Sequence, residues 1–138
     1  MAEALRQERL RSLRIFPDAV EAIKRLSSGH ILALVTNGQP DYQRAKVEAL
    51  GLLPYFQVFL ISGEVGMGKP APGIFLEAAR RVGVNLSEAM HIGDSLANDV
   101  AGAKAAGLTA VWLNRAGTTR PADAPVPDHE IASLGELL

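Results

Sequence analysis

Three polar segments of the sequence carry groups suited to binding phosphate. Thr36-Asn37-Gly38 supplies a hydroxyl, Lys69 in the loop 66–70 supplies an ammonium, and Asp94 and Asp99 supply two carboxylates. A hydroxyl with adjacent backbone N–H groups can hold phosphoryl oxygens, and a lysine neutralises the charge of a phosphoryl group in transfer. Two carboxylates suit a hard cation such as Mg²⁺, which takes few protein oxygens and keeps most of its waters. Taken as a set, these residues predict a site that binds a phosphoryl group or takes part in its transfer.

Each segment also has a purely structural interpretation. Asn37 and Gly38 tolerate positive φ and would suit a simple turn, and Lys69 would be an ordinary solvated lysine. Asp94 would cap a helix, and Asp99 would be an acid in the first helical turn, where the helix dipole favours it. Any one of these signals is weak alone. Their order and spacing together favour the phosphate interpretation.

Strands and helices alternate along the sequence in a way that would position these groups. Short apolar runs predict strands at 31–35, 58–61, 90–92 and 109–113, while helical spacing of apolar residues predicts helices at 17–29, about 40–51, 73–82 and 98–106. Residues 130–131 would add an edge strand and 134–138 a closing helical turn. This alternation predicts an α/β fold with a parallel sheet and helices on both faces. All three polar segments then fall near the carboxyl ends of strands, where chemistry collects in such sheets.

Composition narrows the class of protein. The 138 residues fit one domain, and 48% hydrophobic with 21% charged residues is typical of a globular chain. A net charge of −1 predicts no broad basic surface for nucleic acid or an acidic membrane. The sequence contains no cysteine, which excludes disulfides and thiol catalysis. Because no apolar run approaches the roughly 20 residues of a membrane span, we expect a soluble, cytoplasmic domain without nucleic-acid or membrane partners.

The segments VTNG, EVGMGKPAPGIF, HIGDSLANDV and AVWLNRAG resemble the haloacid dehalogenase superfamily of hydrolases, over about residues 16–138. The resemblance implies that Thr36, Asn37 and Gly38 bind the substrate phosphoryl group. It also implies that Lys69 is catalytic and steadies the nucleophile and the phosphoryl charge.

For the metal site, the resemblance implies that Asp94 ligates Mg²⁺, held weakly here, and that Asp99 supports it. The Gly93-Asp94 pair resembles the corresponding pair in the capped phosphatase branch of the superfamily. This branch includes pyrimidine 5′-nucleotidases and phosphoglycolate phosphatases. Dehalogenases proper work without a metal and usually replace this pair. The ligand implied is a small phosphorylated metabolite or phosphate. Tyr42, Gln43 and Arg115 at the same end of the sheet are too few to name a substrate.

The family's first motif, an Asp-x-Asp that follows a strand, is absent from this sequence. In the family its first aspartate is the nucleophile and its second the general acid/base. By resemblance, residues 1–15 are a remnant of the last helix of a cap. Residues 16–138 are then a Rossmann-like three-layer α/β/α core domain, which forms the C-terminal two-thirds of the family chain. We therefore expect this chain to be inactive alone.

The family's first strand would lie in the middle of the sheet, between the strand ending at Val35 and the strand ending at Ile92. Without it, both strands have inner edges with unpaired N–H and C=O groups, each costing about 1–3 kcal/mol if buried. Direct pairing of the two strands, a strand exchanged in a homodimer, or a separately encoded N-terminal segment would each close the gap.

Two classes of function follow from this pattern. One is a Mg²⁺-dependent phosphatase, as one half of a split hydrolase or as a truncated product. The other is a non-catalytic remnant that binds phosphate, a ligand or a partner. A response-regulator receiver domain shares the alternating topology, but it needs an early acidic pair and a phosphorylatable aspartate after a middle strand, which do not fit here. The presence of a neighbouring reading frame that encodes Asp-x-Asp would distinguish the phosphatase from the non-catalytic remnant.

Overall fold

The computed structural model describes residues 17–138, so the predicted cap remnant at residues 1–15 lies outside the described residues. The helices are α2 (Pro17–Ser27), α3 (Pro40–Ala49), α4 (Ser62–Val65), α5 (Gly73–Val82) and α6 (Ala101–Ala106), with short turns η1 (Leu53–Tyr55), η2 (Leu86–Glu88), η3 (Leu96–Val100) and η4 (Leu134–Leu137). The strands are β1 (Ala33–Thr36), β2 (Val58–Ile61), β3 (Met90–Gly93), β4 (Thr109–Leu113) and β5 (His129–Ile131).

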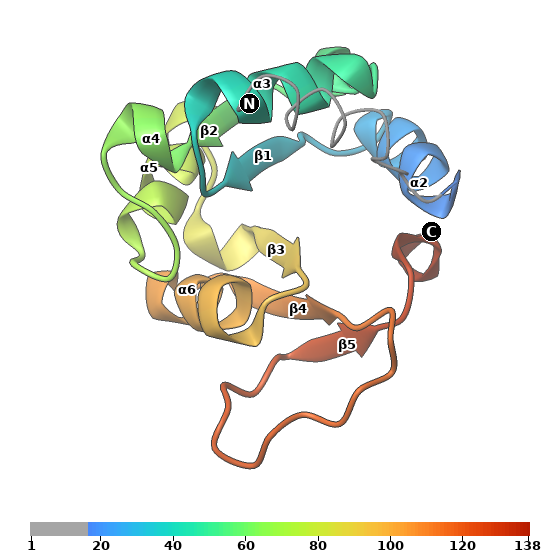
Figure 1. The fold of residues 1–138 in the computed structure, drawn as a ribbon, viewed down its shortest axis with the longest axis vertical. Helices are drawn as coiled ribbons and strands as arrows, with labels where there is room; N and C mark the ends of the chain where they lie inside the picture. The colour runs from blue at the N-terminus through green and yellow to red at the C-terminus, as the bar shows by residue number, and fades with distance from the viewer. Residues whose placement is uncertain (1–16) are drawn as a thin grey trace, which may run out of the picture.

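The strands form two parallel sheets instead of one (Figure 1). β1 pairs with β2, with Val35 opposite Leu60, and β4 pairs with β3 on one side and with β5 on the other. This confirms the predicted Rossmann-like α/β fold with mostly parallel strands. In the described residues no strand joins β1 to β3, and these two strands do not pair with each other.

Helices α5 and α6 connect the two sheets. One apolar cluster joins β2 to α5 through Leu60, Ile74 and Phe75, and α6 adds Ala106 to it. A second cluster packs α6 against β4 through Ala103 and Trp112. The close approach of the helices depends on a glycine, because a Cβ on Gly102 would lie 2.7 Å from the Phe75 ring.

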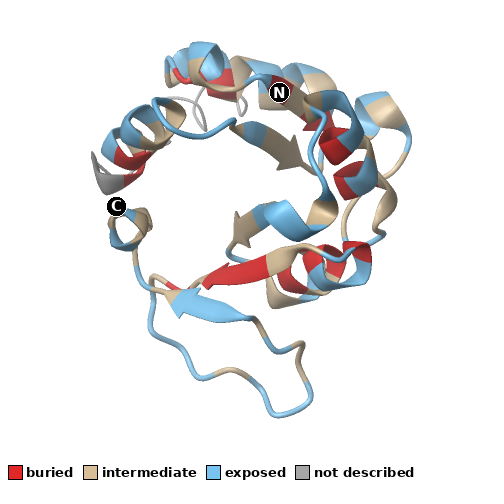
Figure 2. Cartoon of the chain, turned by 180° about the vertical axis from the view of Figure 1, so that it is seen from behind, coloured by how far each residue is buried: buried red, intermediate tan, exposed pale blue. Residues whose placement is uncertain are grey.

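The strands differ in burial according to their place in the sheets. β2 and β4 are mostly buried, as the apolar runs at 58–61 and 109–113 predict. β1 and β3 are also apolar, but each begins with an exposed residue and contains no buried one. Figure 2 shows this contrast, with β4 buried while the strands bordering the gap are not. β1 is less buried than the apolar run 31–35 predicts, because β2 pairs with one of its edges and no strand in the described part of the chain pairs with the other.

Several element boundaries differ from the prediction, most of them by one or two residues. β1 begins at Ala33 and leaves Ile31 52% exposed. The helix expected at 98–106 begins at Leu96, as a single π-helical turn, because the Ser95 hydroxyl caps it by accepting from the Asn98 amide at 3.0 Å. Residues 62–65, expected in a loop, form the short helix α4. No helix in the described residues is long and apolar enough to cross a membrane.

Candidate phosphate-binding site

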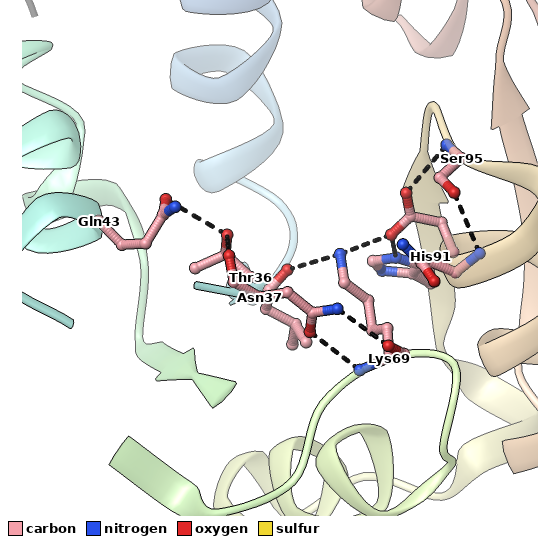
Figure 3. Close-up of polar contacts among 9 residues, drawn as sticks. Thr36, Asn37, Gln43, Lys69, His91 and Ser95 are labelled. Carbon is pink, nitrogen blue, oxygen red and sulfur yellow. Dashed lines mark hydrogen bonds and ion pairs between the residues drawn. The ribbon is translucent and has the colours of Figure 1, made fainter. Parts of the chain in front are cut away.

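Lys69 is the centre of the polar site (Figure 3). Its ammonium donates to Asp99 Oδ1 at 2.6 Å and to the backbone carbonyl of Val35 in β1 at 3.3 Å. The side chains of Lys69 and Asp99 are only 12% and 6% exposed. The contact therefore ties together the loop before α5, the end of β1 and the turn after β3.

Asp99 accepts three hydrogen bonds in a nearly solvent-free position. Oδ1 also contacts His91 Nε2 at 2.9 Å, and Oδ2 accepts from the Ser95 amide at 3.0 Å. Burial alone would raise the pKa of this carboxyl, but the hydrogen bonds from His91 and Lys69, the charge of Lys69 and the Ser95 amide lower its pKa to about 2. Asp99 is thus a permanent anion at neutral pH, held as the counter-ion of Lys69.

Gly93 makes room for this carboxylate. A Cβ at Gly93 would lie 2.1 Å from Asp99 Cγ, far inside any real contact. The glycine that ends β3 therefore lets the first turn of the following helix place its acid directly under the strand. The close approach of the Asp99 side chain therefore requires glycine at position 93.

Asn37 locks the Lys69 loop to the end of β1. Its Nδ2 donates to the Lys69 carbonyl at 2.9 Å, and its Oδ1 accepts from the Lys69 amide at 2.9 Å. The side-chain amide thus donates to and accepts from the backbone of one residue, as the backbone of a neighbouring strand does in a sheet. The Asn37 side chain is therefore a positioning group for Lys69, and what it can offer an anion is its backbone N–H.

Thr36 and Gly38 lie beside this lock. The Thr36 hydroxyl is 3.4 Å from Gln43 Oε1, within reach of a weak hydrogen bond. The Gly38 amide donates to Ser62 Oγ at 2.9 Å, so an anion would take this donor by displacing the serine hydroxyl. Gly38 has φ of 139°, and a Cβ there would lie 2.7 Å from Gln43 Nε2. Glycine is thus required at this turn.

Asp94 lies apart from these contacts. It is exposed just past the end of β3, and its backbone carbonyl accepts from Trp112 Nε1 at 3.1 Å. The structural interpretation of Asp94 as a helix cap is wrong, because Ser95 caps this helix instead. The indole therefore fixes the backbone of the turn while the Asp94 carboxylate faces solvent.

The residues at this site can supply only some of the ligands that a Mg²⁺ site needs. Within residues 17–138 no group of three or more acidic or histidine side chains is placed to hold a metal. Asp99 already accepts from three donors, which leaves the Asp94 carboxylate as the oxygen ligand that the predicted pair can offer. Mg²⁺ is commonly held by one or two carboxylates together with waters and phosphate oxygens, so Asp94 suits it but does not complete a cage.

The structure brings Thr36, Asn37, Lys69 and Asp99 together, with Asp94 at the exposed side of the same strand ends. Sequence reasoning missed His91, whose ring lies in a T-shaped arrangement with the Phe75 ring at 4.7 Å between centroids. A polar residue in the middle of an apolar strand is the signal that could have found it. Ser62, directly after the strand 58–61, is expected at the same edge of the sheet, but its contact with Gly38, 24 positions away, is seen only in the structure.

Comparison with known proteins decides the family. A family model described as haloacid dehalogenase-like hydrolase matches residues 2–107. The chain belongs to the haloacid dehalogenase-like hydrolase family. The family resemblance predicted from the sequence is thereby confirmed, and the relatives below mark the chain as phosphatase-like.

Among curated relatives, the phosphoserine phosphatase of Thermus thermophilus is 44% identical over 99% of this chain and 55% of its own length. The glyceraldehyde 3-phosphate phosphatase of Methanopyrus kandleri is 40% identical over 91% of this chain and 56% of its own. Among solved structures, a HAD phosphatase from Thermococcus onnurineus superposes with a TM-score of 0.87 at 41% identity, covering 99% of this chain and 62% of that one. The chain thus spans about half the length of the curated relatives it matches.

Proposed function

We propose that this chain is the phosphoryl-binding part of a Mg²⁺-dependent phosphatase that acts on small phosphate monoesters. The observation that carries the proposal is the meeting of Thr36, Asn37 and Lys69 at the carboxyl end of β1, with Lys69 held on Asp99. The names of the relatives, each a phosphatase of a small phosphorylated compound, support the same class of substrate.

Each residue has a distinct part in this proposal. Lys69, fixed by Asn37 and Asp99, presents a positive charge toward the phosphoryl oxygens. The Thr36 hydroxyl and the Asn37 backbone N–H donate to the same oxygens. The Asp94 carboxylate holds Mg²⁺, which when bound supplies further positive charge to the phosphoryl group.

Among residues 17–138, no carboxylate is placed to act as the nucleophile. Covalent phosphoryl transfer needs a carboxylate in line with the phosphorus, opposite the leaving oxygen. Asp99 is taken by Lys69, and Asp94 lies at the metal side. Glu64 is held by Arg44 through contacts of 2.6 and 3.1 Å. We therefore propose that this chain binds phosphate but does not turn over phosphate monoesters by itself.

A steady-state assay on the pure chain with Mg²⁺ and a panel of phosphate monoesters tests the catalytic part. We expect no detectable turnover. A kcat within about 1–10³ s⁻¹ that Asp94→Asn abolishes would contradict us. Restoration of such a rate by a separately expressed segment carrying Asp-x-Asp would favour a split hydrolase over a binding remnant.

Amide NMR during titration with inorganic phosphate tests the binding part independently of turnover. We expect shifts at Asn37 and Gly38 at tens of millimolar phosphate, because neither amide depends on a missing carboxylate. The Lys69→Met variant should lose these shifts, while Lys104→Met should keep them, since Lys104 donates to the Val126 carbonyl away from the site. No shift at Asn37 or Gly38 would refute phosphate binding.

A further inference from the structure

Gln43 is a half-buried polar residue at the site, and the proposed function leaves it unused. It belongs to the first turn of α3, where its backbone amide donates to the Gln39 carbonyl at 3.1 Å. A Cβ at Gly63 would lie 2.8 Å from Pro40 Cδ, so the start of α4 packs closely on the start of α3. The backbone that carries the Gln43 side chain is therefore held in place.

The Gln43 side-chain amide lies against the turn at residues 36–38. A Cβ at Gly38 would lie 2.7 Å from Gln43 Nε2, so this nitrogen uses the space that the glycine leaves beside the backbone. Gln43 Oε1 is 3.4 Å from the Thr36 hydroxyl. Figure 3 shows Thr36 between Gln43 and Lys69. An anion bound at the Thr36 hydroxyl would therefore meet the Lys69 ammonium on one side and the Gln43 amide on the other.

The side-chain donors of Thr36 and Gln43 are weakly engaged by the protein itself. The Thr36 hydroxyl is 3.3 Å from the Asn37 carbonyl and 3.4 Å from Gln43 Oε1, whereas an O–H···O hydrogen bond is ordinarily about 2.7–2.8 Å long. Within residues 17–138, no acceptor takes a hydrogen bond from Gln43 Nε2. In the same part of the chain, no fully buried side-chain nitrogen or oxygen lacks a partner, so Nε2 is open to solvent. A ligand can reach this nitrogen without displacing a protein acceptor in the described residues.

We infer that Gln43 is a further phosphate-binding residue, which donates from Nε2 to a phosphoryl oxygen on the side away from Lys69. The inference rests on the proposed function, because it adds a donor to the same site. A phosphate group has three strong acceptor oxygens, and a glutamine amide has two N–H donors. Lys69 supplies positive charge to these oxygens, while the Gln43 amide supplies a directed hydrogen bond without charge.

Titration of the full chain with inorganic phosphate, followed by NMR, tests the inference. The side-chain NH₂ signals of Gln43 should shift with the same Kd as the Asn37 amide. Gln43→Ala removes the donor and introduces a residue of high helix propensity, so the variant should fold and its phosphate Kd should rise about fivefold. Gln43→Glu replaces the donor by a negative charge and should raise the Kd further.

Gln57→Glu is the matched control for charge. Gln57 is exposed and directly precedes β2, whose other end lies beside Thr36. Four residues of strand, about 13 Å, separate it from the site, which exceeds the Debye length of about 8 Å at physiological salt. The phosphate Kd of this variant should therefore stay within about twofold of the native value.

A double-mutant cycle with Thr36→Val separates direct donation from orientation of the threonine hydroxyl. If Gln43 donates to phosphate, Gln43→Ala should weaken binding by a similar factor in the native chain and in Thr36→Val. An effect that vanishes in Thr36→Val would make Gln43 a positioning residue for Thr36 and would overturn the inference.

Equal phosphate Kd values for the native chain and Gln43→Ala would also overturn the inference, as would Gln43 NH₂ signals that stay fixed while the Asn37 amide shifts. In these cases phosphate still binds, so the proposed function stands. Absence of any shift at Asn37 and Gly38 in the native chain would instead overturn the proposed function, and the inference with it.

Discussion

The ion pair between Lys69 and Asp99 makes a quantitative prediction. Asp99→Asn keeps the shape of the side chain but removes its charge, and it places an NH₂ group among donors from Lys69, His91 and Ser95. The Lys69 ammonium, 12% exposed, then lacks its counter-ion. Removing one partner of a buried pair typically costs about 3–5 kcal/mol. We expect the free energy of unfolding to fall by about 3 kcal/mol.

The control is the same chemical change at an exposed pair. Glu64→Gln breaks the contact with Arg44, whose side chain is 45% exposed while that of Glu64 is 35% exposed. Surface pairs contribute about 0–1 kcal/mol. Urea unfolding followed by the fluorescence of Trp112, the single tryptophan, measures both variants. A loss below about 1 kcal/mol for Asp99→Asn, or equal losses for both variants, would refute the description of Asp99 as the buried counter-ion.

The pH dependence provides a second measurement of the same pair. The pKa of Asp99 falls from its usual 3.8 to about 2 on folding. A depressed carboxyl pKa stabilises the fold above the unfolded value, and this stability is lost as pH falls from 3.8 toward 2. The shift corresponds to about 2 kcal/mol. The native chain should therefore lose about 2 kcal/mol more than Asp99→Asn between pH 5 and pH 2, and parallel pH curves would contradict this.

Two further predictions concern the end of β3. Mg²⁺ should bind the isolated chain in the millimolar range or weaker, because Asp94 is the carboxylate left to it; titration followed by Trp112 fluorescence or calorimetry measures this, and micromolar binding would contradict it. Gly93→Ala should destabilise the fold by about 1–3 kcal/mol through overpacking, since its Cβ would lie 2.1 Å from Asp99 Cγ, whereas Gly29→Ala, with nothing within 4 Å, should stay within about 0.5 kcal/mol in the same urea experiment.

The local sequence was sufficient to predict the bounds of those elements that pack against the buried core. The bounds of β2, β4 and α5 match the prediction because their apolar residues face a packed core, which makes spacing a reliable signal. The start of β1 was wrong because Ile31 is apolar but exposed, at the end of a strand with one open edge.

Sequence reasoning could predict which residues form the site, but it could not predict the contacts between them. Strand ends place Thr36, Lys69 and Asp94 near one another by topology alone. The sequence does not reveal that Asp99 serves Lys69 and His91, since those contacts span 30 and 8 positions. Nor does it show that Gly38 donates to Ser62, a contact made only once α4 replaces the expected loop.

The lock between Asn37 and Lys69 also bears on how this protein ages chemically. In an asparagine–glycine pair, the glycine nitrogen can attack the asparagine side-chain carbonyl, which releases ammonia and converts the residue to an acid. Here both atoms of the Asn37 amide are engaged by the Lys69 backbone, and the Gly38 N–H is directed to Ser62. Ring closure would have to turn the Asn37 side chain out of these contacts toward the Gly38 nitrogen, so the folded state shields a dipeptide that would deamidate readily in an unfolded chain. A carboxylate formed there would face the Lys69 carbonyl with no proton to give, so the damage would release the loop that carries the lysine.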